Sequence, residues 1–166
     1  VAALRETSVR RLFAWLSVVQ VGFLVAGLVT LSDKGLEAML FHGIAYAVMT
    51  IGLLATIAPI VEQAGSDDFE VLRGLGRRRG GARMLAVALI VLLLSLSAVP
   101  PLAGHEGRAL LLAALLESGG SALAFVAACN SILGLLCCAR VVAILLDRPH
   151  DADENVPLDF ETVVLV

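Results

Sequence analysis

Long stretches without a charged side chain alternate with short charged segments along the chain. The uncharged stretches cover residues 13–31, 38–61, 84–104 and 118–139, which are 19, 24, 21 and 22 residues long. About 20 apolar residues, rising about 1.5 Å each in an α-helix, cross a hydrocarbon core about 30 Å thick. The pattern therefore predicts an all-α fold, a polytopic transmembrane helix bundle with four spans at about 12–31, 37–61, 82–116 and 119–146.

The third of these spans is too long to be one straight helix. Residues 82–117 would extend about 54 Å if fully helical, and Pro100 and Pro101 interrupt them. Proline lacks a backbone N–H, so the carbonyls of Leu96 and Ser97 lose their helical partners. A glycine-rich segment follows, and we expect the break at 100–107. Two interpretations stay open: a discontinuity inside the membrane, where transporters place ion sites, or a helix that leaves the membrane at Pro100.

The composition supports a membrane protein. Apolar residues make up 59% of the chain and charged residues 16%, with a mean hydropathy of +0.94, whereas soluble domains have about 45–50% and about 25%. The net charge is −3, and no basic face carries interleaved aromatic residues. Nucleic-acid binding is therefore not expected.

Arginines predict the orientation of the spans. Nine of them flank the spans on one side, and Lys34 is on the other; the nine are Arg5, Arg10, Arg11, Arg73, Arg77, Arg78, Arg79, Arg83 and Arg148. The positive-inside rule places the nine in the cytoplasm, and four crossings give a consistent alternation. We expect a multi-pass protein of the bacterial inner membrane. Residues 147–166 would form an acidic cytoplasmic tail that ends in the start of a further span.

Polar residues inside predicted spans are the candidates for function, because they are costly there. Gln20 lies in the first span. His42, Tyr46 and Thr50 share one face of the second, since they are four residues apart. Such a stripe could carry protons, because imidazole and hydroxyl groups both donate and accept them. The alternative is that these groups join helices by hydrogen bonds. Arg140, near the end of the fourth span, is expected to reach the cytoplasmic surface.

A second cluster of ionisable residues follows the two prolines. His105, Glu106 and Arg108 occupy four positions, and Glu106 and Arg108 could neutralise each other. No nucleophile–base pair, phosphate loop or metal-binding set accompanies them, and the three cysteines form no CxxC pair. We therefore expect no catalytic centre, metal or cofactor in this chain.

Five segments together carry a resemblance to a known family. They are VRRLFAWLSVVQVGF at 9–23, MLFHGIAYAVMTIG at 39–52, LRGL at 72–75, LSLSAVPPLAG at 94–104 and Arg140–Val141. In this order and spacing they resemble the antiporter-like subunits of respiratory complex I, and most of all the subunit N branch of NADH–quinone oxidoreductase.

The resemblance implies a fragment that matches helices ten to thirteen of about fourteen, with an intramembrane break in the third helix. It implies a subunit of a proton-translocating NADH–quinone oxidoreductase, an enzyme only as part of that translocase. Its partners would be the lipid bilayer and other membrane subunits, with quinone bound elsewhere. The lysine of the family motif falls on Arg108. The candidates for the proton pathway are Arg108, Glu106, His105, His42, Tyr46 and Gln20.

Two alternative functions fit the same motifs. One is a subunit of a Mrp-type cation/proton antiporter or of a membrane-bound hydrogenase. The other is a degenerate structural module that packs the membrane arm without transport. Arg108 favours the structural module, because arginine, unlike lysine, does not release its proton. The ionisable residues His105 and Glu106 argue for transport.

Overall fold

The computed structural model describes residues 2–148, so most of the predicted acidic tail lies outside the described residues. Five α-helices and three short 3-10 helices occur in this part of the chain. They are η1 (Ala2–Arg5), α1 (Val9–Val29), α2 (Asp33–Ala64), η2 (Phe69–Leu72), η3 (Leu75–Arg77), α3 (Gly81–Leu96), α4 (Ala103–Glu117) and α5 (Ser121–Leu146).

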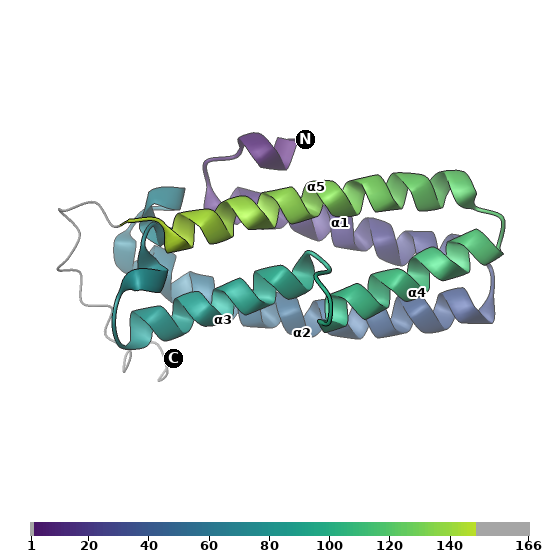
Figure 1. Ribbon diagram of the computed structural model, residues 1–166, viewed down its shortest axis with the longest axis horizontal. Coiled ribbons are helices and arrows are strands. Elements are labelled where there is room, and N and C mark those ends of the chain that lie inside the picture. Colours follow the sequence, from purple (N-terminus) through teal and green to yellow (C-terminus); the bar gives the residue numbers. More distant parts are fainter. Residues whose placement is uncertain (1, 149–166) are drawn as a thin grey trace.

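The helices form one elongated antiparallel bundle (Figure 1). Helices α1, α2 and α5 run along its length, and α3 and α4 follow one another along α2, which contacts both. The prediction of an all-α bundle is confirmed, and the long third segment is built from two helices.

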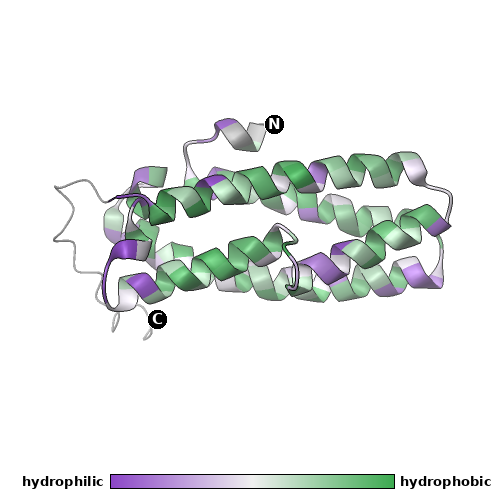
Figure 2. Ribbon diagram, viewed as in Figure 1, coloured by the Kyte–Doolittle hydropathy of each residue, from purple (hydrophilic) through white to green (hydrophobic). Residues whose placement is uncertain are grey.

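The outer surface of the bundle is apolar. Helices α1, α2 and α5 are each long and apolar enough to cross a membrane, yet only 33%, 28% and 22% of their most apolar segments are buried within the protein. Figure 2 shows hydrophobic residues along the helices and hydrophilic ones gathered mainly near the two ends and the middle of the bundle. A surface of this kind is expected where lipid, rather than water, surrounds the helices.

The arginine-rich segments meet at one end of the bundle, as the alternation of spans predicts. The backbone N–H of Val9 donates to Asp67 O at 2.8 Å, and that of Gly74 donates to Ile144 O at 3.1 Å. The start of α1, the connection between α2 and α3, and the end of α5 are thereby joined. At the opposite end, Lys34 and Glu117 form an ion pair of 2.7 Å. That the arginine-rich end lies in the cytoplasm stays a prediction.

Side chains define where α1 begins. The Ser8 side chain accepts a hydrogen bond from Arg11 N at 3.3 Å, and the Asp67 carboxylate accepts one from Arg10 N at 3.1 Å. Two of the free N–H groups of the first turn are thus satisfied. As expected, Arg140 reaches this end, where Nη1 donates to Glu6 O at 3.2 Å.

The break in the third segment lies at 97–102, earlier than the predicted 100–107. Helix α3 ends at Leu96, and after the C-cap Ser97 the chain passes through a left-handed residue, Ala98. The N–H of Ala98 donates to Ser95 O and that of Val99 donates to Leu94 O, both at 3.1 Å. This is a Schellman motif. The helix resumes at Ala103, two residues after Pro101.

The two glycines that suggested a longer loop are helical because neighbouring segments approach them closely. A Cβ at Gly104 would lie 1.8 Å from Ser95 O, and one at Gly107 would lie 2.8 Å from His42 Nδ1. Glycine lets α4 pack directly against the end of α3 and against α2.

Replacement of Gly104 by alanine is expected to destabilise the protein. The added methyl group would collide with the Ser95 carbonyl, and we expect a loss of about 1–3 kcal/mol in the free energy of unfolding. Gly134→Ala is the matched control, because a Cβ there meets nothing within 4 Å. Thermal unfolding midpoints in detergent should fall for Gly104→Ala only; equal midpoints for the two variants would contradict this packing.

Candidate functional site

The candidate site is built around the backbone carbonyl of Leu96, the last residue of α3. The Schellman motif satisfies the carbonyls of Leu94 and Ser95 but not that of Leu96. This oxygen instead accepts hydrogen bonds from Gln20 Nε2 at 3.2 Å and from Arg108 Nη2 at 2.6 Å. At Leu96, the loss of a helical partner that the prolines predict is therefore compensated by side chains from α1 and α4.

Arg108 lies in the protein interior and leaves only 3% of its surface exposed. Its guanidinium carbon lies 4.7 Å from the centre of the Phe23 ring, and Nη2 binds the C-terminal carbonyl of α3. Both contacts favour a cation, through the ring quadrupole and through the negative end of the helix dipole. The other two nitrogens, Nε and Nη1, have no hydrogen-bond partner in the described part of the chain. The site therefore holds a guanidinium cation with one hydrogen bond, from Nη2, and one contact with an aromatic ring.

His42 and Gln20 extend the hydrogen bonds to α2. His42 Nε2 lies 3.1 Å from Gln20 Oε1, and both side chains are 1% exposed. A carbonyl can only accept, so the amide nitrogen of Gln20 must face Leu96 O and its oxygen must face His42. His42 Nε2 therefore carries a proton and donates it to this bond. Within the described residues Nδ1 has no hydrogen-bond partner, and it lies against Gly107.

The other two ionisable residues of α4 lie apart from Arg108. His105 is half-buried, with Nδ1 3.2 Å from Ala98 O, and Glu106 is exposed on the bundle surface. Because this segment is helical, residues two positions apart point to different sides. The proposed neutralisation of Arg108 by Glu106 does not occur in the structure.

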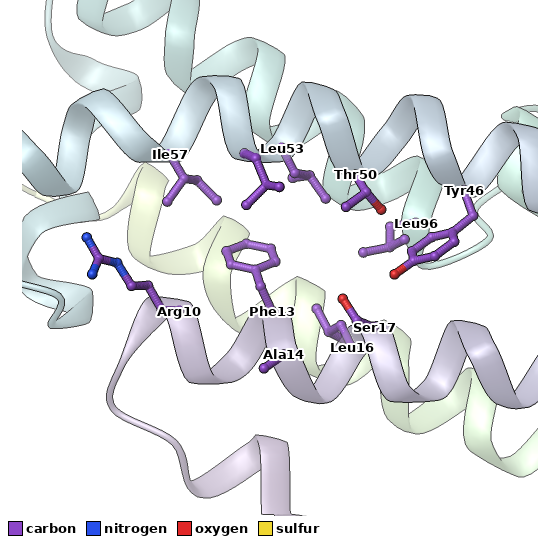
Figure 3. A pocket seen from close by; sticks show the side chains of 11 residues that line it. Arg10, Phe13, Ala14, Leu16, Ser17, Tyr46, Thr50, Leu53, Ile57 and Leu96 are labelled. Carbon is purple, nitrogen blue, oxygen red and sulfur yellow. The ribbon is translucent and has the colours of Figure 1, made fainter.

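Tyr46 and Thr50 lie on the same helix as His42 but open into a different space. They line a mostly apolar groove of about 370 Å³ between α1 and α2, together with Ser17 and Phe13. Figure 3 shows the hydroxyl groups of Tyr46 and Ser17 pointing toward each other across it. The predicted stripe is thus divided, with His42 in the buried network and the two hydroxyl-bearing residues in the groove.

Three contributors to the site were not singled out by sequence reasoning. They are Phe23, Gly104 and Gly107. The position of Phe23, three residues after Gln20 and hence on the same helical face, was an available signal. In residues 2–148, no group of three or more His, Cys, Asp or Glu side chains could hold a metal ion.

The arrangement can hold charge but offers no covalent chemistry. Gln20 and the Leu96 carbonyl connect a permanent cation, Arg108, to a titratable imidazole, His42. An amide and a carbonyl do not exchange protons readily. The network can therefore couple the two groups electrostatically, whereas a proton that reaches His42 must arrive by another route.

Comparison with known proteins identifies the family of this chain. The family described as "NADH:quinone oxidoreductase/Mrp antiporter, TM" matches residues 1–134. NADH-quinone oxidoreductase subunit N 2 of Sorangium cellulosum is 35% identical over 162 residues, covering 95% of this chain and 31% of the relative. Subunit N of Syntrophotalea carbinolica is 37% identical over 157 residues, covering 94% and 33%.

A third relative agrees with these. NAD(P)H-quinone oxidoreductase subunit 2 of Gloeothece citriformis is 32% identical over 157 residues, covering 94% of this chain and 30% of the relative. The chain thus spans about a third of the length of the curated relatives it matches. With the family match over most of its residues, the chain belongs to the transmembrane family of NADH:quinone oxidoreductases and Mrp antiporters.

Proposed function

We propose that this chain contributes part of an antiporter-like proton pathway to the membrane arm of an NADH–quinone oxidoreductase. The observation that carries the proposal is the buried Arg108 at the helix break, bonded to Leu96 O at 2.6 Å. An ionisable group within a membrane bundle is costly and is a functional candidate for that reason. Broken helices whose ends face charged groups are the sites at which transporters bind ions.

In this proposal Arg108 is the fixed charge and not the proton carrier. Its guanidinium keeps its proton in proteins, and its contacts with Phe23 and Leu96 O hold it in place. A permanent positive charge here would oppose the protonation of nearby groups and would expel a proton that arrives. His42 is the candidate carrier that belongs to the network, whereas Tyr46, four residues along α2, lines the groove.

The names and sources of the relatives support a proposal for the partners and the location. The names of the matched relatives denote subunits of multi-subunit quinone oxidoreductases, so we infer that other membrane subunits surround this chain and that quinone binds elsewhere. The relatives compared are bacterial, which supports the bacterial inner membrane, with the arginine-rich end in the cytoplasm.

A structural role without transport is the second candidate. The observation in its favour is that Arg108 and Gln20 satisfy the Leu96 carbonyl, so the network also explains how a broken helix is tolerated inside a membrane. The family description also includes Mrp antiporters, for which the same site would move protons against another cation.

Substitution of Arg108 in the assembled complex tests the fixed charge. Arg108→Lys keeps a cation and is expected to retain most NADH-driven proton pumping, whereas Arg108→Met is expected to reduce it by at least tenfold. Arg83→Met, at an exposed arginine on α3, is the control. Pumping is measured by quenching of a pH-sensitive dye in membrane vesicles and is normalised to the amount of complex. If Arg108→Met assembles and pumps normally, the transport role is wrong.

Substitution of His42 tests the proposed carrier. In His42→Gln the new amide can still donate to Gln20 Oε1, so assembly should persist, but an amide cannot take up and release a proton. We expect NADH-driven pumping to fall several-fold while the amount of complex stays within about 20% of the unsubstituted level. Undiminished pumping would show that protons bypass His42, and loss of the complex itself would favour the structural role.

Glu106 and His105 stay candidates for the pathway, although neither contacts the network. Glu106→Gln should abolish pumping with assembly intact if the carboxylate carries protons. If Glu106→Gln pumps normally, or fails only because the complex does not assemble, Glu106 has no part in proton transfer.

A further inference from the structure

Glu106 lies near the middle of the bundle and not at its ends. It belongs to the first turn of α4, and Figure 1 shows that α4 begins about halfway along the bundle. It lies eleven positions before Glu117, which pairs with Lys34 at the bundle end. At about 1.5 Å per residue this is about 16 Å, about half of a hydrocarbon core about 30 Å thick. The carboxyl group is therefore close to the depth of the bilayer midplane.

The side chain of Glu106 faces away from every cation at this depth. It is exposed, and it forms no ion pair with any residue in the range 2–148. Arg108 points into the bundle, and His105 is turned toward Ala98 O. No group on α4, α3 or α2 therefore neutralises Glu106 within the described chain.

A carboxylate in contact with lipid at the midplane is unfavourable, and ionisable residues in membranes pair with one another or with backbone groups. The surface around Glu106 is suited to a close approach, because the neighbouring Ala103 is small and exposed and Leu110 is 47% exposed. Small and apolar side chains around a single charge fit a membrane helix better than a polar partner. The charge itself requires that the helix carry a cation opposite it.

From this placement we propose that the outer face of α4 around Glu106 docks a membrane helix outside residues 1–166 that presents a lysine or arginine at the bilayer midplane. This surface, Ala103, Glu106 and Leu110, is separate from the network on the inner face of α4. The proposal concerns the assembly of the chain with a neighbour and does not depend on proton transfer through Arg108.

Photo-crosslinking in native membranes identifies the occupant. A benzophenone amino acid replaces Leu110, which leaves Glu106 and the small Ala103 intact, and in a control it replaces Phe125 on α5, which is 71% exposed. We expect adducts at position 110 to map by mass spectrometry to a membrane segment that contains Lys or Arg, and adducts at position 125 not to map to that segment. Adducts with lipid only, or with a helix that lacks a basic side chain, would overturn the proposal.

Charge substitution tests whether Glu106 itself makes the contact. With the crosslinker at position 110, Glu106→Gln is expected to reduce the yield of the adduct at least threefold, and Glu106→Lys to reduce it further. Combining Glu106→Lys with Lys→Glu or Arg→Glu at the mapped partner should restore it. An unchanged yield in Glu106→Gln would refute the proposed pair.

A hydrophobic carbodiimide provides an independent readout, because it reacts with a protonated carboxyl group that is open to lipid. A carboxylate paired with a cation is expected to be protected, so Glu106 in the intact complex should remain unmodified by peptide mapping. Modification of Glu106 in the intact complex would mean that the side chain faces lipid in its neutral form, and the proposal would then be wrong. Neither readout uses proton pumping, so the outcome is independent of the transport role proposed for Arg108.

Discussion

The Leu96 carbonyl is the group on which the organisation of the bundle depends. A backbone acceptor inside a membrane has no water to bond, so a helix can break there only where other protein groups supply donors. Gln20 and Arg108 supply them from α1 and α4. Because Gln20 and Arg108 must both reach this oxygen, the hydrogen bonds define which faces of α1 and α4 turn toward the end of α3. His42 on α2 is joined to the same set through Gln20.

Close approach of backbones makes this arrangement possible. Gly104 allows α4 to begin against the end of α3, and Gly107 allows it to pack on His42. Without hydrophobic association in lipid, close packing and hydrogen bonds are the main forces that hold membrane helices together. The same two glycines therefore bring the positive charge of Arg108 to the C-terminal end of α3, where the helix dipole favours a cation.

The two charges of α4 serve different surfaces of the bundle because of helical geometry. Arg108 faces the interior, where an aromatic ring and a carbonyl stabilise it, while Glu106 faces outward. A mutual ion pair would have cancelled both charges locally. Because they are separated, Arg108 takes part in the interior network and Glu106 is available to a neighbouring helix. The helix break therefore has an internal site on one side and the outer surface around Glu106 on the other, at about the same depth.

The sequence by itself predicted the all-α bundle, the meeting of the arginine-rich segments at one end, and an interruption of the third segment near the prolines, with Leu96 among the carbonyls that lose a helical partner. The length of an apolar segment, the positions of arginines and the missing N–H of proline are local properties of the chain. Their effects do not depend on which helices pack together. Only the tertiary structure decided that Arg108 and Gln20 satisfy that carbonyl and that Glu106 lies outside. Both outcomes depend on which helical faces meet in the folded bundle. Gly104 and Gly107 are typical of a loop in the sequence, yet they lie within α4, where neighbouring segments approach them closely.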